Sequence, residues 1–591
     1  MYKAPLKELR FVLHQLVGDG QLAGLNGFAD YSSDFADSVL EEAGKFAEEV
    51  LAPINRLGDT RGAKWTADGV VMPPEFKDAY AKFIEGGWPL LRARTEHGGQ
   101  GAPTVLGTAV EELWASSNLA FKLCPMLSQG AVEAIERCAS EQQKQTYLPK
   151  MVTGEWTGTM VLTEPQAGSD LGAIRTRAVP EGDHYRLYGQ KIFITYGDHD
   201  YTPNTIHMVL GRIEGSPMGT KGISLFIVPK VLVNADGSLG QRNDVRCVSI
   251  EHKLGIHASP TCVLAFGDQR GAVAHLVGEP NRGLEYMFIM MNAARLSVGL
   301  EGYAVAERAF QQALAYSRGR VQGRPGGKVS AGGKPLPIAY HPDVKRMLLT
   351  MKAYADAARA VAIYAALQLD LGMHHPDETH QAASQARGDL LIPIVKAWST
   401  EIGVAMASMG VQVHGGMGFI EETGAAQYLR DVRITTIYEG TTGIQAADLV
   451  GRKIARDAGV AMNSLIDDMH AELETLLPAD VTAASALEGV KLLHEATSSL
   501  LQALRQDAER GQAVSVPYLT LCGVVIGGWL MAKSHEIATR QMAQDEEFHR
   551  AKQQIVHAYM EQILPQAHAL ARVVKSAGAS IADADPALLG A

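Results

Sequence analysis

Apolar and polar positions follow a helical rhythm over roughly the first quarter of the chain. In DFADSVLEEAGKFAEEVLAPI one apolar stripe recurs at helical spacing and consists of Phe35, Val39, Leu40 and Ala43. Pro53 is expected to end this run, because proline has no N–H for the helical ladder. The pattern predicts an N-terminal helical domain over residues 1–156.

The rhythm changes near Trp156. The segments MVLTEP, HYRLYGQKIFITYG, TIHMVLGRI and GISLFIVPKVL are short, rich in β-branched and aromatic residues, and separated by glycine or asparagine turns. They predict a central β-domain over residues 157–281.

Helical periodicity returns after Gly283 and is broken by a Gly/Pro-rich loop at 323–337. This predicts a second helical bundle over residues 282–450, followed by a helical C-terminal extension over 451–591. The expected fold class is therefore α+β with four domains, in agreement with the number that 591 residues suggest.

Charge and composition exclude several classes of protein. Hydrophobic residues make up 46% and charged residues 20%, as in an ordinary soluble globular protein. The net charge of −11 argues against nucleic acid as the main partner, because a nucleic-acid-binding surface needs excess basic charge.

Cysteine usage and the apolar runs indicate a cytoplasmic protein. The five cysteines are scattered and form no C-x-x-C pair, so we expect neither disulfides nor a zinc site. The segment MYKAPLKELRFVLHQLV lacks the continuous apolar core of a secretion signal. The longest apolar run, Tyr518–Ala532, contains three glycines and is shorter than a bilayer span, so we expect a buried helix; interfacial membrane contact is the alternative.

Three segments partly match known motifs but do not support a serine hydrolase, a P-loop or a metal site. HGGMGF at 414–419 is not accompanied by a G-x-S-x-G nucleophile elbow, and GRPGGKVS at 323–330 misses the P-loop spacing. The histidines of GMHHPDETH are expected to be solvated rather than to bind a metal.

Two segments carry candidate chemistry. In VLTEPQAGSDLGAIRTRA, Ser169 and Asp170 either cap a loop or lie beside free N–H groups that bind a cofactor phosphate. In RDVRITTIYEGTTGIQ, Glu439 lies between an aromatic residue and a glycine. It is either a solvated surface charge or a carboxylate base that projects into a pocket.

Together with GQKIFITYG (189–197), EHKLGIHAS (251–259) and VQVHGGMGF (411–419), these segments resemble the acyl-CoA dehydrogenase family of flavoproteins. The resemblance runs over about residues 35–450. It implies a helical domain, a β-barrel and a four-helix bundle, with FAD as cofactor.

The resemblance also assigns flavin contacts. Thr163 matches a residue that bonds the flavin ring, and Ser169 one that contacts both the FAD pyrophosphate and the substrate. Thr195 matches a threonine that bonds near the reactive nitrogen of the ring, and Phe193 replaces the family's usual tryptophan. The flavin site is expected to persist with a phenyl surface in place of an indole.

Further residues match a part of the family's site that is shared between subunits. Gln412, Gly416 and Thr441 match positions that hold the adenine half of a neighbouring subunit's FAD, which implies a homodimer or a higher homo-oligomer. Arg320 matches the family's flavin-contacting arginine only loosely, because Gln322 replaces an aromatic residue.

Glu439 matches the family's catalytic base, which removes the α-proton of an acyl-CoA while the β-hydrogen leaves as hydride to the flavin, giving trans-2-enoyl-CoA. Some relatives place the base on the helix that corresponds to MNAARLSVG, which has no carboxylate here. The resemblance assigns contacts with the substrate to Ser169, Arg295, Tyr438 and Gly440.

The extension resembles that of a bacterial subgroup that includes 3-methylmercaptopropionyl-CoA dehydrogenases and fatty acyl-CoA dehydrogenases. Electron-transferring flavoprotein is the expected electron acceptor. An acyl-CoA oxidase remains an alternative, as does a DNA-binding damage-response relative. The latter needs a basic extension, whereas residues 451–591 hold 12 basic and 17 acidic residues.

Overall fold

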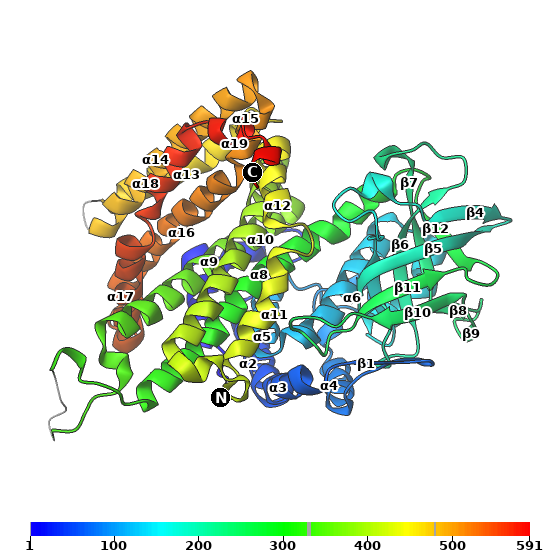
Figure 1. Ribbon diagram of the computed structural model, residues 1–591, viewed down its shortest axis with the longest axis horizontal. Helices are drawn as coiled ribbons and strands as arrows, with labels where there is room; N and C mark the ends of the chain where they lie inside the picture. Colours follow the sequence, from blue (N-terminus) through cyan, green and yellow to red (C-terminus); the bar gives the residue numbers. More distant parts are fainter. Residues whose placement is uncertain (1, 328–332, 478–479, 591) are drawn as a thin grey trace. The chain divides into compact units, whose positions relative to one another are not determined.

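The computed structural model describes residues 2–327, 333–477 and 480–590, and the chain divides into two compact units. The helical unit comprises Met1–Gly44, Pro103–Ser116 and Val298–Ala591, and the barrel unit comprises Lys45–Ala102 and Ser117–Ser297 (Figure 1). The loop expected at 323–337 falls partly on residues 328–332, which lie outside the described residues.

The first predicted helix differs from the structure at its beginning and at its end. Helix α2 (Ser33–Phe46) buries Leu40 and Ala43, but Phe35 is 38% exposed and Ala36 is buried instead. The expectation that Pro53 ends the run is wrong, because helix α3 (Ala52–Arg61) continues past it. A π-helical turn at Ala47–Leu51 interrupts the ladder just before the proline, which then occupies the first turn of α3, where its missing N–H costs no hydrogen bond.

Helices and one hairpin form the N-terminal part of the barrel unit. After α3 come α4 (Pro74–Glu85), α6 (Leu119–Cys138) and α7 (Glu141–Val152). The hairpin of β1 (Lys64–Thr66) and β2 (Gly69–Val71) corrects the all-helical prediction for this region. It is held to the β-domain by Asp198, whose Oδ2 accepts the N–H of Val70 at 3.2 Å.

Five strands of the barrel unit close on themselves. In ring order they are β5 (His184–Thr195), β12 (Ala272–Val277), β7 (Ile223–Pro229), β6 (Thr205–Ile213) and β4 (Arg177–Glu181), and β4 pairs again with β5. The remaining strands are β3 (Thr157–Val161) beside β6, β10 (Val245–Ile250) and β11 (Thr261–Phe266) continuing from β5, and the hairpin of β8 (Val231–Val233) and β9 (Leu239–Arg242). The predicted central β-barrel is therefore present.

Strand β5 serves two sheets because it is long. Residues 184–188 pair with β4 and residues 189–195 pair with β11. The change of partner occurs at Gly189, where an added Cβ would lie 2.5 Å from Thr176 Oγ1, so only glycine fits. The second half of β5 therefore lies outside the closed ring of strands, and it contains Phe193 and Thr195, which match the flavin site.

The helical unit contains the second bundle and the extension. Its elements in chain order are α1 (Leu6–Arg10), α2, α5 (Thr104–Ser117), α8 (Gly283–Gly319), α9 (Pro342–His374), α10 (Glu378–His414), α11 (Ala425–Val432), α12 (Thr442–Asp448), α13 (Val460–Leu476), α14 (Val481–Gln506), α15 (Ala508–Ala513), α16 (Ser515–Arg540), α17 (Glu546–Gln562), α18 (Gln566–Lys575) and α19 (Ala579–Ala582). Helices α2, α5 and α8 continue across a boundary between the units. Within the helical unit, α16 packs on both α9 and α10, so the extension joins the bundle (Figure 1).

The apolar run Tyr518–Ala532 forms the buried centre of α16, as predicted. Two helical segments, Glu378–Phe419 and Ser515–Arg540, are long and apolar enough to span a membrane, but 83% of each apolar window is buried inside the protein. The glycines of the run have a packing role: at Gly523 an added Cβ would lie 2.3 Å from Trp398 Cγ on α10.

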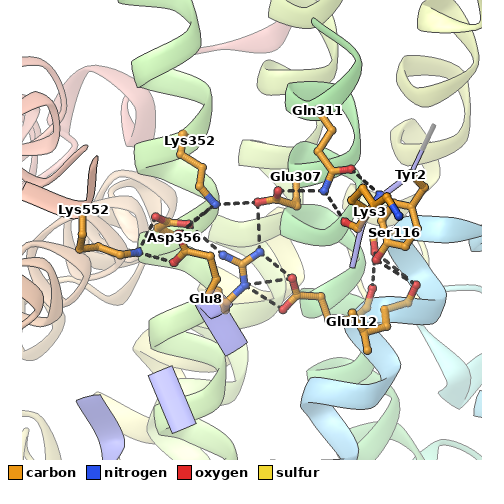
Figure 2. A network of polar contacts seen from close by, with 12 residues as sticks. Tyr2, Lys3, Glu8, Glu112, Ser116, Glu307, Gln311, Lys352, Asp356 and Lys552 are labelled. Carbon is orange, nitrogen blue, oxygen red and sulfur yellow. Dashed lines mark hydrogen bonds and ion pairs between the residues drawn. The ribbon is translucent and has the colours of Figure 1, made fainter. Parts of the chain in front are cut away.

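A buried ionic network connects helices far apart in sequence (Figure 2). Arg359 on α9 has no exposed side-chain surface and donates to both oxygens of Glu112 on α5, at 2.6–3.0 Å. It also contacts Glu307 on α8 at 3.2 Å and Asp356 at 2.8 Å. Lys352 bridges Glu307 and Asp356 at 3.0 and 2.9 Å.

The same network reaches the chain's N-terminal segment and the extension. Lys552 on α17 contacts Asp356 at 2.8 Å and also contacts Glu8 on α1. Beside it, the rings of Phe11 and Phe548 meet edge to face at 5.7 Å. The N-terminal segment and the extension therefore contact each other as well as the bundle.

We expect Gly523→Ala to lower the free energy of unfolding by about 1–3 kcal/mol, because the added methyl overlaps the Trp398 ring and the packed helices must shift. The measurement is denaturant unfolding followed by tryptophan fluorescence. Gly20→Ala is the matched control, because an added Cβ at Gly20 meets nothing within 4 Å. Equal midpoints for the two variants would show that α10 and α16 are less tightly packed than described.

Candidate functional site

The T-E-P-x-A-G-S-D segment forms a compact loop after β3. Glu164 and Ala167 exchange two backbone hydrogen bonds at 3.0 Å, and Asp170 caps the following turn by accepting the N–H of Gly172 at 2.9 Å. Ser169 is exposed at the loop's surface. The capping interpretation therefore holds for Asp170, while Ser169 remains accessible to a ligand.

Glu164 fastens this loop to the barrel. Its carboxylate accepts the backbone N–H groups of Arg175 and Thr176 at 2.7 and 2.9 Å, the Thr176 hydroxyl at 2.6 Å and the Lys191 ammonium at 2.9 Å. Lys191 also donates to the carbonyl of Leu162 at 2.7 Å. Two buried charges thus fix both ends of the loop to β5.

The pKa values of this pair follow from burial and mutual attraction. Burial opposes the ionisation of Glu164, but the Lys191 cation and the hydrogen-bond donors outweigh it and lower the pKa to about 2. Burial lowers the pKa of Lys191 to about 8, although Glu164 favours the charged form. Both groups are therefore ionised near neutral pH.

A β-bulge projects Phe193 out of β5. The register with β11 shifts between Cys262 and Leu264, and Phe193 has φ 60°, which is unusual for a residue with a side chain. Phe193 is 58% exposed. The neighbouring Ile192 N–H donates to the carbonyl of Thr163 at 2.9 Å, so the exposed ring lies next to the predicted flavin-contacting threonine.

These features suit the isoalloxazine ring of FAD. An exposed aromatic side chain on a strained but well-fastened strand offers a flat apolar surface for stacking. Thr163, in the loop after β3, accepts the N–H of Ile192 just before Phe193, and the half-buried Thr195 follows two residues later on β5, where its carbonyl accepts the Thr159 hydroxyl at 2.8 Å. The structure thus brings Thr163, Phe193 and Thr195 together on the barrel unit.

In the helical unit, Tyr438, Glu439 and Gly440 form a tight turn before α12. Glu439 has φ 55° and Gly440 has φ 94°. Thr441 then caps α12, because its Oγ1 accepts the N–H of Ile444 at 3.3 Å. The half-buried Glu439 is not on a regular solvent-facing helix surface.

The ends of α8 and α10 bring other predicted residues into one region. The rings of Tyr316 and His414 stack at 4.4 Å, which places the end of α8, followed by the exposed Arg320, beside the end of α10. Gln412 and Gly416 lie there and are exposed. An added Cβ at Gly416 would meet nothing within 4 Å, so this glycine leaves space at the surface.

One predicted substrate contact is buried, and three residues that contact the Glu439 turn were not predicted. Arg295 lies on α8 and is only 5% exposed. The Tyr438–Gly440 turn is contacted by Lys396 from α10, Gln445 from α12 and Glu301 from α8. The sequence assigned a role to none of the three, although Gln445 ends the RDVRITTIYEGTTGIQ segment. Among the described residues, no group of three histidine, cysteine or acidic side chains could hold a metal ion.

Comparison with known proteins decides the family. The chain matches models of the acyl-CoA dehydrogenase N-terminal domain at 33–155, middle domain at 159–269 and C-terminal domain at 281–455, and an acetyl-CoA dehydrogenase C-terminal-like model at 465–585. It is 44% identical to the 3-methylmercaptopropionyl-CoA dehydrogenase of Ruegeria pomeroyi, covering 96% of this chain and 97% of that protein. The chain belongs to the acyl-CoA dehydrogenase family. The dehydrogenase is therefore an oxidoreductase of an FAD-dependent family, as its motifs predicted.

Two further relatives match nearly the whole chain, including the C-terminal extension. It is 32% identical to the broad-specificity linear acyl-CoA dehydrogenase FadE5 of Mycobacterium tuberculosis, with 99% of both chains covered. The Caenorhabditis elegans ACDH-11 structure, solved with C11-CoA, has a TM-score of 0.76 over 95% of this chain and 92% of that one. At 20% identity this second likeness shows the fold alone, and it confirms the helical, β, helical and extension order.

We expect Glu164→Gln to lower the free energy of unfolding by about 3–5 kcal/mol and to weaken FAD retention, because Lys191 loses its buried counter-charge. The checks are denaturant unfolding and the FAD content after gel filtration. Glu181→Gln is the control, since its ion pair with Arg186 is exposed and should not affect either quantity.

The pH dependence of that difference has a defined sign. The folded-state pKa of Glu164 lies below its ordinary value of 4.5, so its stabilisation is complete above 4.5 and declines as the pH falls toward 2. The stability gap between the wild type and Glu164→Gln should close over this window. A gap that stays constant would contradict the assignment of the low pKa to Glu164.

Proposed function

We propose that this acyl-CoA dehydrogenase acts on a short acyl chain, with 3-(methylthio)propanoyl-CoA converted to 3-(methylthio)acryloyl-CoA. The observation that carries the proposal is the 44% identity to the Ruegeria enzyme over nearly the whole of both chains. A thioether chain resembles a short alkyl chain in size and polarity, so butyryl-CoA is expected to be a substrate as well.

Glu439 is the base in this proposal. The α-hydrogen of a thioester is weakly acidic, so its removal needs a positioned carboxylate together with donors for the negative charge that develops on the carbonyl oxygen. The turn at Tyr438–Gly440 supports this role, because it holds the Glu439 side chain on a constrained backbone. The backbone N–H of Glu439 serves as a donor to the thioester oxygen. FAD, held by the contacts named below, would supply the acceptor for the hydride that leaves the β-carbon.

The proposed FAD contacts are Thr163, Ser169, Phe193, Thr195, Arg320, Gln412, Gly416 and Thr441. The proposed substrate contacts are Ser169, Arg295, Tyr438 and Gly440. The exposed Phe193 ring and the accessible Gln412 and Gly416 support the first group. Because Gln412 and Gly416 match positions that hold a neighbouring subunit's FAD, a homodimer or larger assembly is part of the proposal. Electron-transferring flavoprotein is the proposed electron acceptor, and the cytoplasm the proposed location.

Fatty acyl-CoA dehydrogenation of longer chains is the second candidate. It is favoured by the 32% identity to the broad-specificity Mycobacterium enzyme, again over the whole chain. The two candidates differ in the length of the acyl group that the enzyme accepts.

Glu439→Gln should slow anaerobic flavin bleaching by acyl-CoA about 10²–10⁴-fold, because the α-proton then has no base to accept it. FAD content and acyl-CoA binding should persist. Glu422→Gln, at an exposed glutamate on the neighbouring segment, is the matched control and should bleach at the wild-type rate. A Glu439→Gln enzyme with normal turnover would refute the assignment.

A panel of acyl-CoAs from propionyl to palmitoyl, with 3-methylmercaptopropionyl-CoA added, separates the two candidates. We expect kcat/KM for the thioether and butyryl substrates to agree within about 10-fold. Both values should exceed kcat/KM for palmitoyl-CoA by more than about 10-fold, since each misfitting methylene costs about 1–3 kcal/mol. Highest kcat/KM with palmitoyl-CoA would favour the long-chain candidate. Rapid reoxidation of the reduced enzyme in air would instead indicate an oxidase.

A further inference from the structure

Three consecutive residues of the Glu439 turn are each held by a polar side chain from a different helix. The Tyr438 hydroxyl donates to the Glu301 carboxylate on α8. The Glu439 carbonyl accepts the Nε2 of Gln445 on α12 at 2.9 Å, and the Gly440 carbonyl accepts the ammonium of Lys396 on α10 at 2.5 Å. Glu301, Gln445 and Lys396 are all fully buried.

The backbone of this turn needs such support. A non-glycine residue with φ 55° lies in a sparsely populated region that costs about 1–3 kcal/mol. Gly440 follows at φ 94°, and an added Cβ there would lie 2.7 Å from Gln445 Nε2, so the glycine is what allows the amide to approach. The two donors hold the carbonyl groups in the orientation that the left-handed turn requires.

We propose that Lys396 and Gln445 are positioning residues that hold Glu439 in its strained conformation and so fix the direction of its carboxylate. The inference rests on the proposed role of Glu439 as base and adds what keeps that base in place. Glu301 acts on the same turn from the preceding position, through Tyr438.

The consequence falls on proton removal more than on substrate affinity. Without the two donors, Glu439 can relax to a negative φ, which swings its side chain away from its original direction. A displacement of about 1 Å at a reacting group can cost on the order of 10²-fold in rate. Of the proposed substrate contacts, Ser169 and Arg295 lie outside this turn and keep their positions, whereas Tyr438 and Gly440 belong to it.

The test uses the FAD-loaded full chain with Gln445→Met, which keeps side-chain length, and Lys396→Met, which shortens the side chain by one atom; both remove the donor. Anaerobic stopped-flow measurement of flavin bleaching by butyryl-CoA should give rate constants about 10–100-fold below wild type, with a much smaller change in the apparent dissociation constant for butyryl-CoA. Gln368→Met is the control, because it removes a buried glutamine from α9, away from the turn.

An isotope effect separates positioning from general damage to the fold. With butyryl-CoA deuterated at the α-carbon, the two variants should show a larger isotope effect than wild type, since removal of the α-proton becomes more strongly rate-limiting. A partly unfolded enzyme would lose bleaching amplitude with an unchanged isotope effect, and that result would overturn the inference. If Lys396→Met does not retain FAD, Gln445→Met decides alone, because it removes no charge.

The outcomes also distinguish this inference from the proposed function. Wild-type rates in Gln445→Met and Lys396→Met beside an inactive Glu439→Gln would overturn the positioning role and leave the base assignment standing. An active Glu439→Gln would remove the base assignment itself.

Discussion

Burial of charge at Arg359 is the constraint on which the helical unit depends. A guanidinium without solvent contact must be surrounded by carboxylates, and here Glu112, Glu307 and Asp356 come from three different helices. The carboxylates respond differently: burial outweighs Arg359 and raises the pKa of Glu112, whereas Lys352 and Arg359 overcome burial and lower the pKa of Glu307 to about 2. Displacing any one of these helices would leave a charge buried without its partner, so the helices are held as a set.

This constraint extends to the Glu439 turn through α8 and through α10, which packs on α9. Helix α8 carries Glu307 in the ionic network and, less than two turns earlier, Glu301 beside Tyr438. Helix α10 packs along α9 and carries Lys396, whose ammonium holds the Gly440 carbonyl. Helix α8 thus belongs to both, and α10 is linked to the network through its packing on α9. On the barrel unit, the pair of Glu164 and Lys191 holds the loop after β3 in an analogous way.

The local sequence pattern predicts much of the fold and the motif residues. It does not predict the long-range contacts that hold these residues in place. Periodicity and turn residues predicted the helical and β segments, and α16 is buried as its apolar run indicated. Pro53 and the hairpin at Lys64–Val71 were misread, because a π-helical turn and a contact with Asp198 decided those structures. Glu112 and Arg359 are 247 residues apart, and Tyr438 and Glu301 are 137 apart, so no window of sequence contains both partners. The positive φ of Phe193 likewise arises from its register with another strand.

The contact between Glu8 and Lys552 has a consequence for the order in which the molecule is made. In the helical unit, Glu8 and the buried Phe11 contact Lys552 and Phe548, which are encoded hundreds of residues later. During synthesis the N-terminal segment emerges from the ribosome long before α17 exists, whereas the barrel unit consists of chain that is complete by Ser297. The barrel unit can therefore fold while translation continues, whereas the helical unit cannot complete its contacts with Glu8 and Phe11 until α17 has been synthesised.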